Sequence, residues 1–312
     1  MTIAILRTAD AWWVHTATGA VRIDSSATTT GGLLADRSAI AAATRGGEAV
    51  PVDALDLLSP VTAPCRVVAQ MTNFASHVKD AGMDPKTVPL TFFRKSSSSI
   101  SGPFDDIVKP AHVKFLDYEV EIGIVIGQTI EVGSVITQDN LADYITAWVV
   151  TNDVSARDVQ LTKTQFYEAK SYPTFTPVGP SLVLIDPAEL QRFNELRLQL
   201  KVNGQLRQNM LVGADMIFSP LHALQALTRF QRLDAGDLLL TGTPVGTALS
   251  APPKPVEKIG ALLPPALKWR LFFASQGKNP KYLRDGDLVE TSVATDDGSI
   301  CLGTQRTTVR FT

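Results

Sequence analysis

The chain has 312 residues, of which 45% are hydrophobic and 19% are charged, so it is long enough to bury the core of one large domain and a smaller one. A formal net charge of −2, with Lys and Arg scattered along the chain, argues against a nucleic-acid partner. No apolar stretch is long enough to span a bilayer, and Cys65 and Cys301 fit neither a disulfide framework nor a zinc site. Because the N-terminus also lacks the basic and apolar regions of a signal peptide, a cytoplasmic protein is expected.

The first 62 residues are predicted to form a small β-rich domain. Short strands are expected at 2–6 and within 12–21, and the glycines of 28–32 indicate a loop. The proline-containing stretch 59–64 is typical of a linker. Residues 63–312 then form the larger domain.

The larger domain is predicted to be mainly β. A buried strand is expected at 66–69 and another at 238–240, and Asn203-Gly204 predicts a tight hairpin turn after a strand at 196–202. Ser219 and Pro220 are a cap and a first-turn proline, so a helix is expected from 220 to about 232. Strands do not alternate regularly with helices, which argues against a doubly wound sheet and favours an α+β, mainly β fold, closed or rolled, with peripheral helices.

The segment 251–279 is proline-rich at its start and aromatic further on. One interpretation is a surface excursion that packs its own aromatic cluster. The other is an interface or a cap over the site. The sequence leaves both open.

A strand at 117–127 carries the most informative pattern. The even positions from Tyr118 to Ile126 are apolar, and the odd positions carry Asp117, Glu119, Glu121 and Gly123. Parallel like charges are unfavourable unless a cation lies between them. The pattern therefore predicts a hard divalent metal site, with Gly123 leaving room beside it. Alternating exposed glutamates on an edge strand are the competing interpretation.

Asp153 follows the strand predicted at 145–150, at a place where a cleft forms. It is the natural third oxygen ligand. Three carboxylates, with water or substrate in the remaining positions, suit Mg²⁺ or Mn²⁺ better than Zn²⁺.

The order of these segments resembles the fumarylacetoacetate hydrolase family over roughly residues 65–310. The resemblance implies that family's mixed β-sandwich roll or barrel, a homodimer and a divalent ion such as Mg²⁺, Mn²⁺ or Ca²⁺. The matching motifs are 117–127 (metal strand), 152–158 (aspartate segment), 169–180 (lysine loop), 241–246 (threonine turn) and 283–287 (late strand entry).

The resemblance also implies a role for each site residue. Glu119, Glu121 and Asp153 would hold the metal, and Lys170 would place an ammonium near the bound substrate. His77, with Asp80 three residues later on a short helix, would activate water. Substrate contacts are expected from the following residues: Phe74, Lys95, Gln160 and Thr243.

The sequence departs from the family pattern at three of these places. Asp80 replaces a glutamate and is one methylene shorter, Phe74 stands where tyrosine is frequent, and Pro173 stands where an aspartate often follows the lysine. Asp158 is expected to pair with its neighbour Arg157 rather than to bind metal. These departures leave the metal ligands intact and affect the substrate and the water-activating step.

The reaction expected first is hydrolysis of a C–C bond in a 2,4-dioxo acid, such as an acylpyruvate or a fumarylacetoacetate-like substrate. The alternatives are a decarboxylase of a β-keto acid such as oxaloacetate, or an isomerase of a 2-oxo or 2-hydroxy-dienoate in aromatic catabolism. All three pass through the same type of enolate. A non-enzymatic scaffold is the remaining alternative, disfavoured by the complete set of polar residues.

Overall fold

The computed structural model describes residues 2–251 and 262–312. Within these residues, ten strands form one sheet, in which most neighbours are antiparallel and β17 runs parallel to β5. In order across the sheet the strands are β4 (Ala49–Val50), β3 (Gly19–Ile23), β2 (Trp12–Thr16), β1 (Ile3–Arg7), β14 (Leu182–Leu184), β11 (Ile145–Asn152), β10 (Val120–Ile126), β17 (Leu238–Leu240), β5 (Val67–Met71) and β6 (Thr91–Lys95).

Five strands of the described chain form a second sheet, which packs against β10 and β11 of the first. The two smaller ladders lie beside the ends of β10 and β11. The second sheet has the order β16 (Gln205–Leu211), β15 (Leu196–Val202), β18 (Leu288–Thr295), β19 (Cys301–Phe311) and β8 (Ile107–Lys109); the small ladders pair β9 (Leu116–Asp117) with β12 (Ser155–Ala156) and β7 (Ile100–Ser101) with β13 (Thr176–Pro177).

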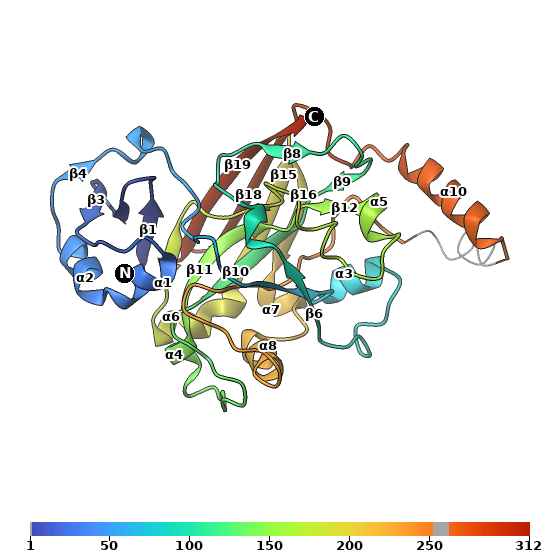
Figure 1. The fold of residues 1–312 in the computed structure, drawn as a ribbon. Helices are drawn as coiled ribbons and strands as arrows, with labels where there is room; N and C mark the ends of the chain where they lie inside the picture. Colours follow the sequence, from blue (N-terminus) through green and yellow to red (C-terminus); the bar gives the residue numbers. More distant parts are fainter. Residues whose placement is uncertain (1, 252–261) are drawn as a thin grey trace.

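Short helices surround the sheets, and α10 extends away from the body of the molecule (Figure 1). This arrangement confirms the predicted α+β, mainly β fold with peripheral helices. The helices are α1 (Thr30–Ala35), α2 (Arg37–Thr44), α3 (Ala75–Asp80), α4 (Leu141–Tyr144), α5 (Arg157–Gln160), α6 (Pro187–Gln191), α7 (Val212–Asp215), α8 (Pro220–Leu227) and α10 (Pro265–Gln276), with 3₁₀ turns η1 (Val52–Ala54), η2 (Ser97–Ser99) and η3 (Arg192–Glu195).

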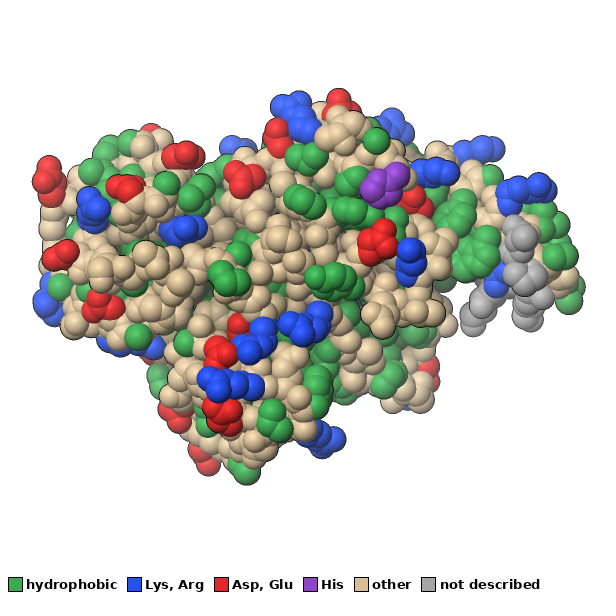
Figure 2. Space-filling view, in the orientation of Figure 1, with side chains coloured by type: hydrophobic (Ala, Val, Ile, Leu, Met, Phe, Trp, Pro, Cys, Tyr) green, Lys and Arg blue, Asp and Glu red, His purple; other side chains and the backbone are tan. Residues whose placement is uncertain are grey.

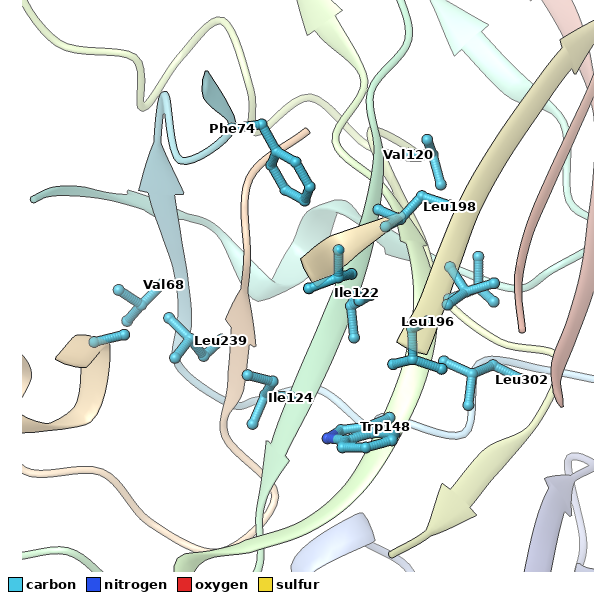
Figure 3. Close-up of a cluster of buried hydrophobic side chains, with 14 of the residues drawn as sticks. Val68, Phe74, Val120, Ile122, Ile124, Trp148, Leu196, Leu198, Leu239 and Leu302 are labelled. Atoms are coloured by element: carbon cyan, nitrogen blue, oxygen red, sulfur yellow. The ribbon is translucent and has the colours of Figure 1, made fainter. Parts of the chain in front are cut away.

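The main core lies between the two sheets. The even-numbered side chains of β10 enter it, as the alternation in the sequence predicts, and meet side chains of β11, β15 and β17. Figure 3 shows this cluster around Ile122, Ile124, Trp148 and Leu196. The odd-numbered positions of β10 are buried as well, because a second cluster covers the other face of the large sheet. β10 is therefore a central strand, not an exposed edge.

The N-terminal strands continue the large sheet. β1 pairs antiparallel with β14, with Ala4 opposite Val183, and Trp12 and Ile40 share a core cluster with Val67. The division of the chain into 1–62 and 63–312 stays a prediction.

The hairpin predicted at Asn203-Gly204 is confirmed. These two residues join β15 to β16, and both have positive φ, 51° for Asn203 and 76° for Gly204. Positive φ at both central positions is the geometry of a type I′ turn. Two boundaries predicted from the sequence were wrong.

The loop predicted at 28–32 is wrong because α1 begins at Thr30, with the Thr29 side chain accepting a hydrogen bond from Gly32 N. The helix needs a glycine at position 31, because a Cβ at Gly31 would lie only 2.4 Å from Ala235 O. The helix predicted to reach about residue 232 ends at Leu227. Beyond it, Leu233 forms a β-bridge with Ile130, which draws the chain out of the helix.

Part of the excursion predicted at 251–279 lies outside the described residues, namely 252–261. In the described part, the Trp269 and Phe273 rings of α10 stack with centroids 5.5 Å apart, and Phe273 stacks on Phe115 of the body at 5.9 Å. Figure 2 shows apolar side chains at the surface of this arm. The excursion thus packs an aromatic cluster, and its use as an interface or a cap stays a prediction.

Two further sequence predictions concern the whole chain. Cys65 and Cys301 are both free, as expected. Within residues 2–251 and 262–312, none of the helices is long and apolar enough to cross a membrane.

Candidate active site

Glu119 immediately precedes β10 and Glu121 is its second residue, and both are held by backbone contacts. Glu119 O accepts a hydrogen bond from Asp153 N at 2.8 Å, and Glu119 N donates to Asn152 Oδ1 at 2.9 Å. Gly242 N donates to Glu121 Oε2 at 2.7 Å. The antiparallel pairing of β10 with β11 thus places Asp153 next to the two glutamates.

The structure brings the three predicted metal ligands together. Glu119, Glu121 and Asp153 are all buried, and one oxygen from each lies within 4.8 Å of the others. Carboxylate oxygens are the donors that Mg²⁺, Mn²⁺ and Ca²⁺ prefer. The donor set therefore fits a hard divalent ion.

Gly123 has a different role from the one predicted. A Cβ at Gly123 would lie 2.7 Å from Val149 Cγ1 and 2.9 Å from a methyl group of Leu238. The neighbouring side chains already fill the space that a larger residue would need. The glycine therefore allows dense packing behind the carboxylates and does not leave room for an ion.

Two buried lysines contact the carboxylate cluster. Lys170 Nζ donates to Glu119 Oε2 at 2.5 Å and to Asp153 Oδ2 at 2.7 Å. Lys95, at the end of β6, donates to Asp153 and, at 2.9 Å, to Phe175 O. The sequence predicted a substrate contact for Lys95, whereas its described contacts are with Asp153 and the backbone.

Arg157 also belongs to this cluster, which the sequence interpretation missed. Its Nη2 lies 2.5 Å from Glu119 Oε1 and its Nε 2.8 Å from Asp117 Oδ2, and all three side chains are buried. The predicted pairing of Arg157 with Asp158 is wrong, because Asp158 accepts from the backbone of Lys114 instead. Strand pairing explains the difference, since β12 places Ser155 opposite Asp117 of β9.

Asp117 ties the cluster to the chain that precedes the excursion. Its carboxylate accepts hydrogen bonds from Ala248 N at 2.8 Å and Leu249 N at 3.1 Å, in addition to Arg157. Asn279 Nδ2 donates to Ala248 O at 2.8 Å from the other end of the excursion. Asp117 could have been found from the sequence, because it shares the odd-numbered positions with the two glutamates.

The cluster has one carboxylate more than it has basic groups. Asp117, Glu119 and Asp153 are each paired with at least one of Lys95, Arg157 and Lys170, whereas Glu121 has none of these partners among the described residues. Burial, with Asp153 and Glu119 close by, raises the pKa of Glu121 well above its ordinary value. Glu121 is therefore the carboxylate that most needs a cation.

The opposite shift at Glu119 follows from its partners. Burial alone would raise its pKa, but Lys170 and Arg157 outweigh burial and lower the pKa of Glu119 to about 2. Burial also opposes the charge on Lys170, yet Asp153 and Glu119 raise the pKa of Lys170. Glu119 and Lys170 are therefore held as an ion pair.

His77 lies on α3 within electrostatic range of Glu119, Arg157 and Lys170 of the cluster, and of Asp80 on its own helix. Burial lowers the pKa of His77, which leaves a neutral imidazole near pH 7. Its Nδ1 is buried without a hydrogen-bond partner, and no hydrogen bond or ion pair joins His77 to Asp80 among the described residues. The structure thus places His77 and Asp80 on one helix but does not join them.

The remaining predicted substrate residues are buried in the protein. Phe74 is 0% exposed and packs in the main core (Figure 3). Gln160 accepts from Arg157 Nη1 at 2.8 Å. Thr243 donates to Val120 O at 2.9 Å and accepts from Gln208 Nε2 at 2.8 Å. Gln208, also missed from the sequence, thus links β16 to the threonine turn, and the substrate roles of these residues stay predictions.

Comparisons with known proteins identify the family of this chain. The model of the fumarylacetoacetate (FAA) hydrolase C-terminal family matches residues 66–310. The chain is 34% identical over 212 residues to oxaloacetate tautomerase Fahd2a, mitochondrial, of Rattus norvegicus, a match that covers 68% of this chain and 66% of that protein. The match thus spans slightly less than two thirds of the relative.

Two solved structures are similar over their full lengths. One is a probable 2-hydroxyhepta-2,4-diene-1,7-dioate isomerase from Mycobacterium abscessus, with a TM-score of 0.74 and 28% identity over 100% of this chain and 99% of that one. The other is a fumarylacetoacetate hydrolase from Exiguobacterium antarcticum, with a TM-score of 0.69 and 26% identity over 100% of both chains. On the family match and the similarity of sequence and fold, the chain belongs to the fumarylacetoacetate hydrolase family.

Proposed function

We propose that this protein is a divalent-metal-dependent isomerase that interconverts the 2-oxo and 2-hydroxy (enol) forms of a small carboxylic acid. The observation that carries the proposal is the buried cluster of Glu119, Glu121 and Asp153 with Lys170 beside it. A Mg²⁺, Mn²⁺ or Ca²⁺ ion held there would act as a Lewis acid toward the carboxylate and 2-oxo oxygens of the substrate.

The basic residues of the chain would favour the enolate form. When a proton leaves C3 of a 2-oxo acid, negative charge develops on the 2-oxo oxygen. The ammonium of Lys170, fixed by Glu119 and Asp153, adds a preorganised positive charge close to that oxygen. Because the cluster is buried, water screens this charge little.

His77 is the group that we assign to the proton transfer. A neutral imidazole accepts the C3 proton, and the same proton is returned to the oxygen, so a C–H bond breaks and an O–H bond forms. The reaction consumes no water and needs no oxidant or reductant. The lowered pKa of His77 keeps the base form available near pH 7.

Isomerisation is preferred to hydrolysis for two reasons. Hydrolysis needs a water molecule activated by a histidine that a carboxylate orients, and the described contacts of His77 include no bond to Asp80. In addition, the relatives named as an oxaloacetate tautomerase and a probable dienoate isomerase support an isomerase. Both named activities move a proton within a 2-oxo or 2-hydroxy acid.

Hydrolysis of a 2,4-dioxo acid is the second candidate. It is favoured by the position of His77 and Asp80 three residues apart on α3 and by the similarity to a fumarylacetoacetate hydrolase. Decarboxylation of a β-keto acid would use the same cluster without an activated water.

One panel of assays separates these reactions. Purified protein is supplied with Mg²⁺ or with EDTA and tested for ketonisation of enol-oxaloacetate, isomerisation of a 2-hydroxy-dienoate, CO₂ release from oxaloacetate and cleavage of an acylpyruvate. The proposal predicts metal-dependent isomerisation that is faster than cleavage or CO₂ release. Cleavage of the acylpyruvate as the dominant metal-dependent reaction would instead establish the hydrolase.

A further inference from the structure

A second cluster of basic side chains surrounds a hollow outside the carboxylate site. The hollow has a volume of about 160 Å³ and lies between the β15–β16 hairpin and residues 280–287. Its wall includes Arg207 of β16, and Lys281 and Arg284 from the segment that leads into β18. Three cations so placed repel one another unless an anion lies between them.

The carboxylate in this wall is already engaged. Asp287 accepts hydrogen bonds from Asn203 Nδ2 at 2.8 Å and from Arg284 N at 2.7 Å, one at each oxygen. Across residues 2–251 and 262–312, neither Asp287 nor another carboxylate forms an ion pair with Arg207, Lys281 or Arg284. The wall therefore has an excess of two positive charges.

Arg207 adds an unsatisfied hydrogen-bond donor to this excess. Its side chain is half-buried, and its Nε is shielded from solvent without an acceptor in the described chain. The backbone of Arg207 is closely packed against Gly246, since a Cβ added at Gly246 would lie 2.1 Å from Arg207 O. A buried guanidinium donor without an acceptor is unfavourable, and Arg207 is one of the residues that line the hollow.

The hollow and the carboxylate cluster are formed by different residues. Gln208, the next residue, reaches towards the cluster, accepting from Val120 N at 3.0 Å and donating to Thr243 Oγ1. None of the residues that line the hollow is one of the three candidate metal ligands. An anion in the hollow would therefore be bound by other side chains than those that would hold the metal.

We propose that this hollow binds a small oxyanion with two negative charges, of the inorganic phosphate class. Its charge matches the excess of the wall, and a tetrahedral oxyanion offers acceptors to guanidinium groups in several directions. The assignment is separate from the isomerase proposal, because it uses none of the residues of the carboxylate cluster.

The experiment is a calorimetric titration of inorganic phosphate into the purified protein, treated with EDTA so that bound metal does not contribute. Wild type is expected to bind one phosphate per chain saturably. Arg207→Gln and Arg284→Gln should each weaken binding by about tenfold or more, as expected for loss of a charge-assisted hydrogen bond. Arg229→Gln, at an exposed arginine without an ion pair in the described structure, is the matched control and should leave binding unchanged.

Three results would overturn the proposal. They are no saturable binding by wild type, equal weakening in Arg207→Gln and Arg229→Gln, or loss of binding in Lys170→Met with retention in Arg207→Gln, which would place the anion in the carboxylate cluster. A melting curve of each variant without phosphate checks folding. In a folded Arg207→Gln protein, phosphate should no longer raise the melting temperature as it does for wild type.

Discussion

Arg157 and Asp117 form a buried ion pair, with Nε of Arg157 2.8 Å from Oδ2 of Asp117. The pair connects two parts of the site, because Arg157 also contacts Glu119 while Asp117 holds the backbone of Ala248 and Leu249. A ligand of the candidate metal site is thereby joined to the chain before the excursion. Both residues of the pair are charged and buried, so loss of the pair is expected to lower the free energy of unfolding.

Replacing Arg157 with methionine should strongly destabilise the protein. The change leaves Asp117 without a counterion in a buried position, which typically costs about 3–5 kcal/mol. Urea unfolding, monitored by circular dichroism, measures the free energy of unfolding. The matched control is Arg310→Met, whose partner Asp106 is exposed and whose loss should cost less than about 1 kcal/mol. Equal losses of stability in the two variants would contradict a stabilising role for the buried ion pair of Arg157 and Asp117.

Replacing Glu121 with glutamine should stabilise the metal-free protein at neutral pH. Because burial and the neighbouring carboxylates raise the pKa of Glu121 in the folded state, its protonated form favours folding, and this contribution is lost as pH rises through the raised pKa. Metal-free wild type should therefore lose stability as pH rises from about the ordinary value of 4.5. The glutamine variant should lack this part of the loss. Parallel pH curves for the two proteins in EDTA would refute the assignment.

Divalent metal should reverse that order of stability. An ion bound only by the folded state stabilises it by about 2.7 kcal/mol at a concentration 100 times Kd. Wild type should show this gain with Mg²⁺ or Mn²⁺, and Glu121→Gln should not, because one of three carboxylate ligands is gone. Unfolding curves with and without metal measure the difference. A metal-induced gain of the same size in both proteins would place the ion elsewhere.

Replacing Lys170 with methionine should separate catalysis from metal binding. Loss of a preorganised positive charge at the reacting oxygen is expected to lower kcat by about 10²–10³-fold. Metal affinity should not fall, because the ammonium no longer competes for Glu119 and Asp153. Steady-state kinetics and calorimetry measure the two effects, with the exposed Lys163→Met as the control. A fall in metal affinity that accounts for the lost rate would make Lys170 a structural residue.

His77 and Asp80 should respond differently to substitution. His77→Gln should lower the isomerisation rate by about 10²–10⁴-fold as a lost acid–base group. Asp80→Asn should leave the rate near that of wild type, since Asp80 does not hydrogen-bond His77 in the described structure. The comparison is made by enol-to-keto kinetics at saturating Mg²⁺. If both variants lose activity to the same extent, the two residues work as a pair and hydrolysis regains support.

The sequence predicted those parts of the structure that depend on local pattern. Alternation along 117–127 placed Glu119 and Glu121 on one face of a strand, and the two central residues of the 203–204 turn fixed a hairpin. The place of Asp153 just after the strand predicted at 145–150 indicated the third carboxylate, and the family resemblance added Lys170; the structure brings both next to the glutamates. Such features can be predicted because each depends on a short local stretch of sequence.

The features that were missed depend on pairing between distant strands. Arg157 is adjacent to Asp158 in sequence, but the β9–β12 ladder turns it towards Asp117, 40 residues away. The role of Gly123 likewise depends on Val149 and Leu238 from neighbouring strands. Whether His77 meets Asp80 depends on side-chain orientation within one helical turn, which spacing alone does not determine.

The most direct test of the proposed activity is proton exchange at C3 of a 2-oxo acid in D₂O, followed by NMR. The substrate is incubated with wild type and Mg²⁺, with wild type and EDTA, or with Glu121→Gln and Mg²⁺. The proposal predicts rapid incorporation of deuterium at C3 by metal-loaded wild type, background exchange in the other two samples, and an intact carbon skeleton. Background exchange by metal-loaded wild type, together with cleavage of an acylpyruvate under the same conditions, would contradict it.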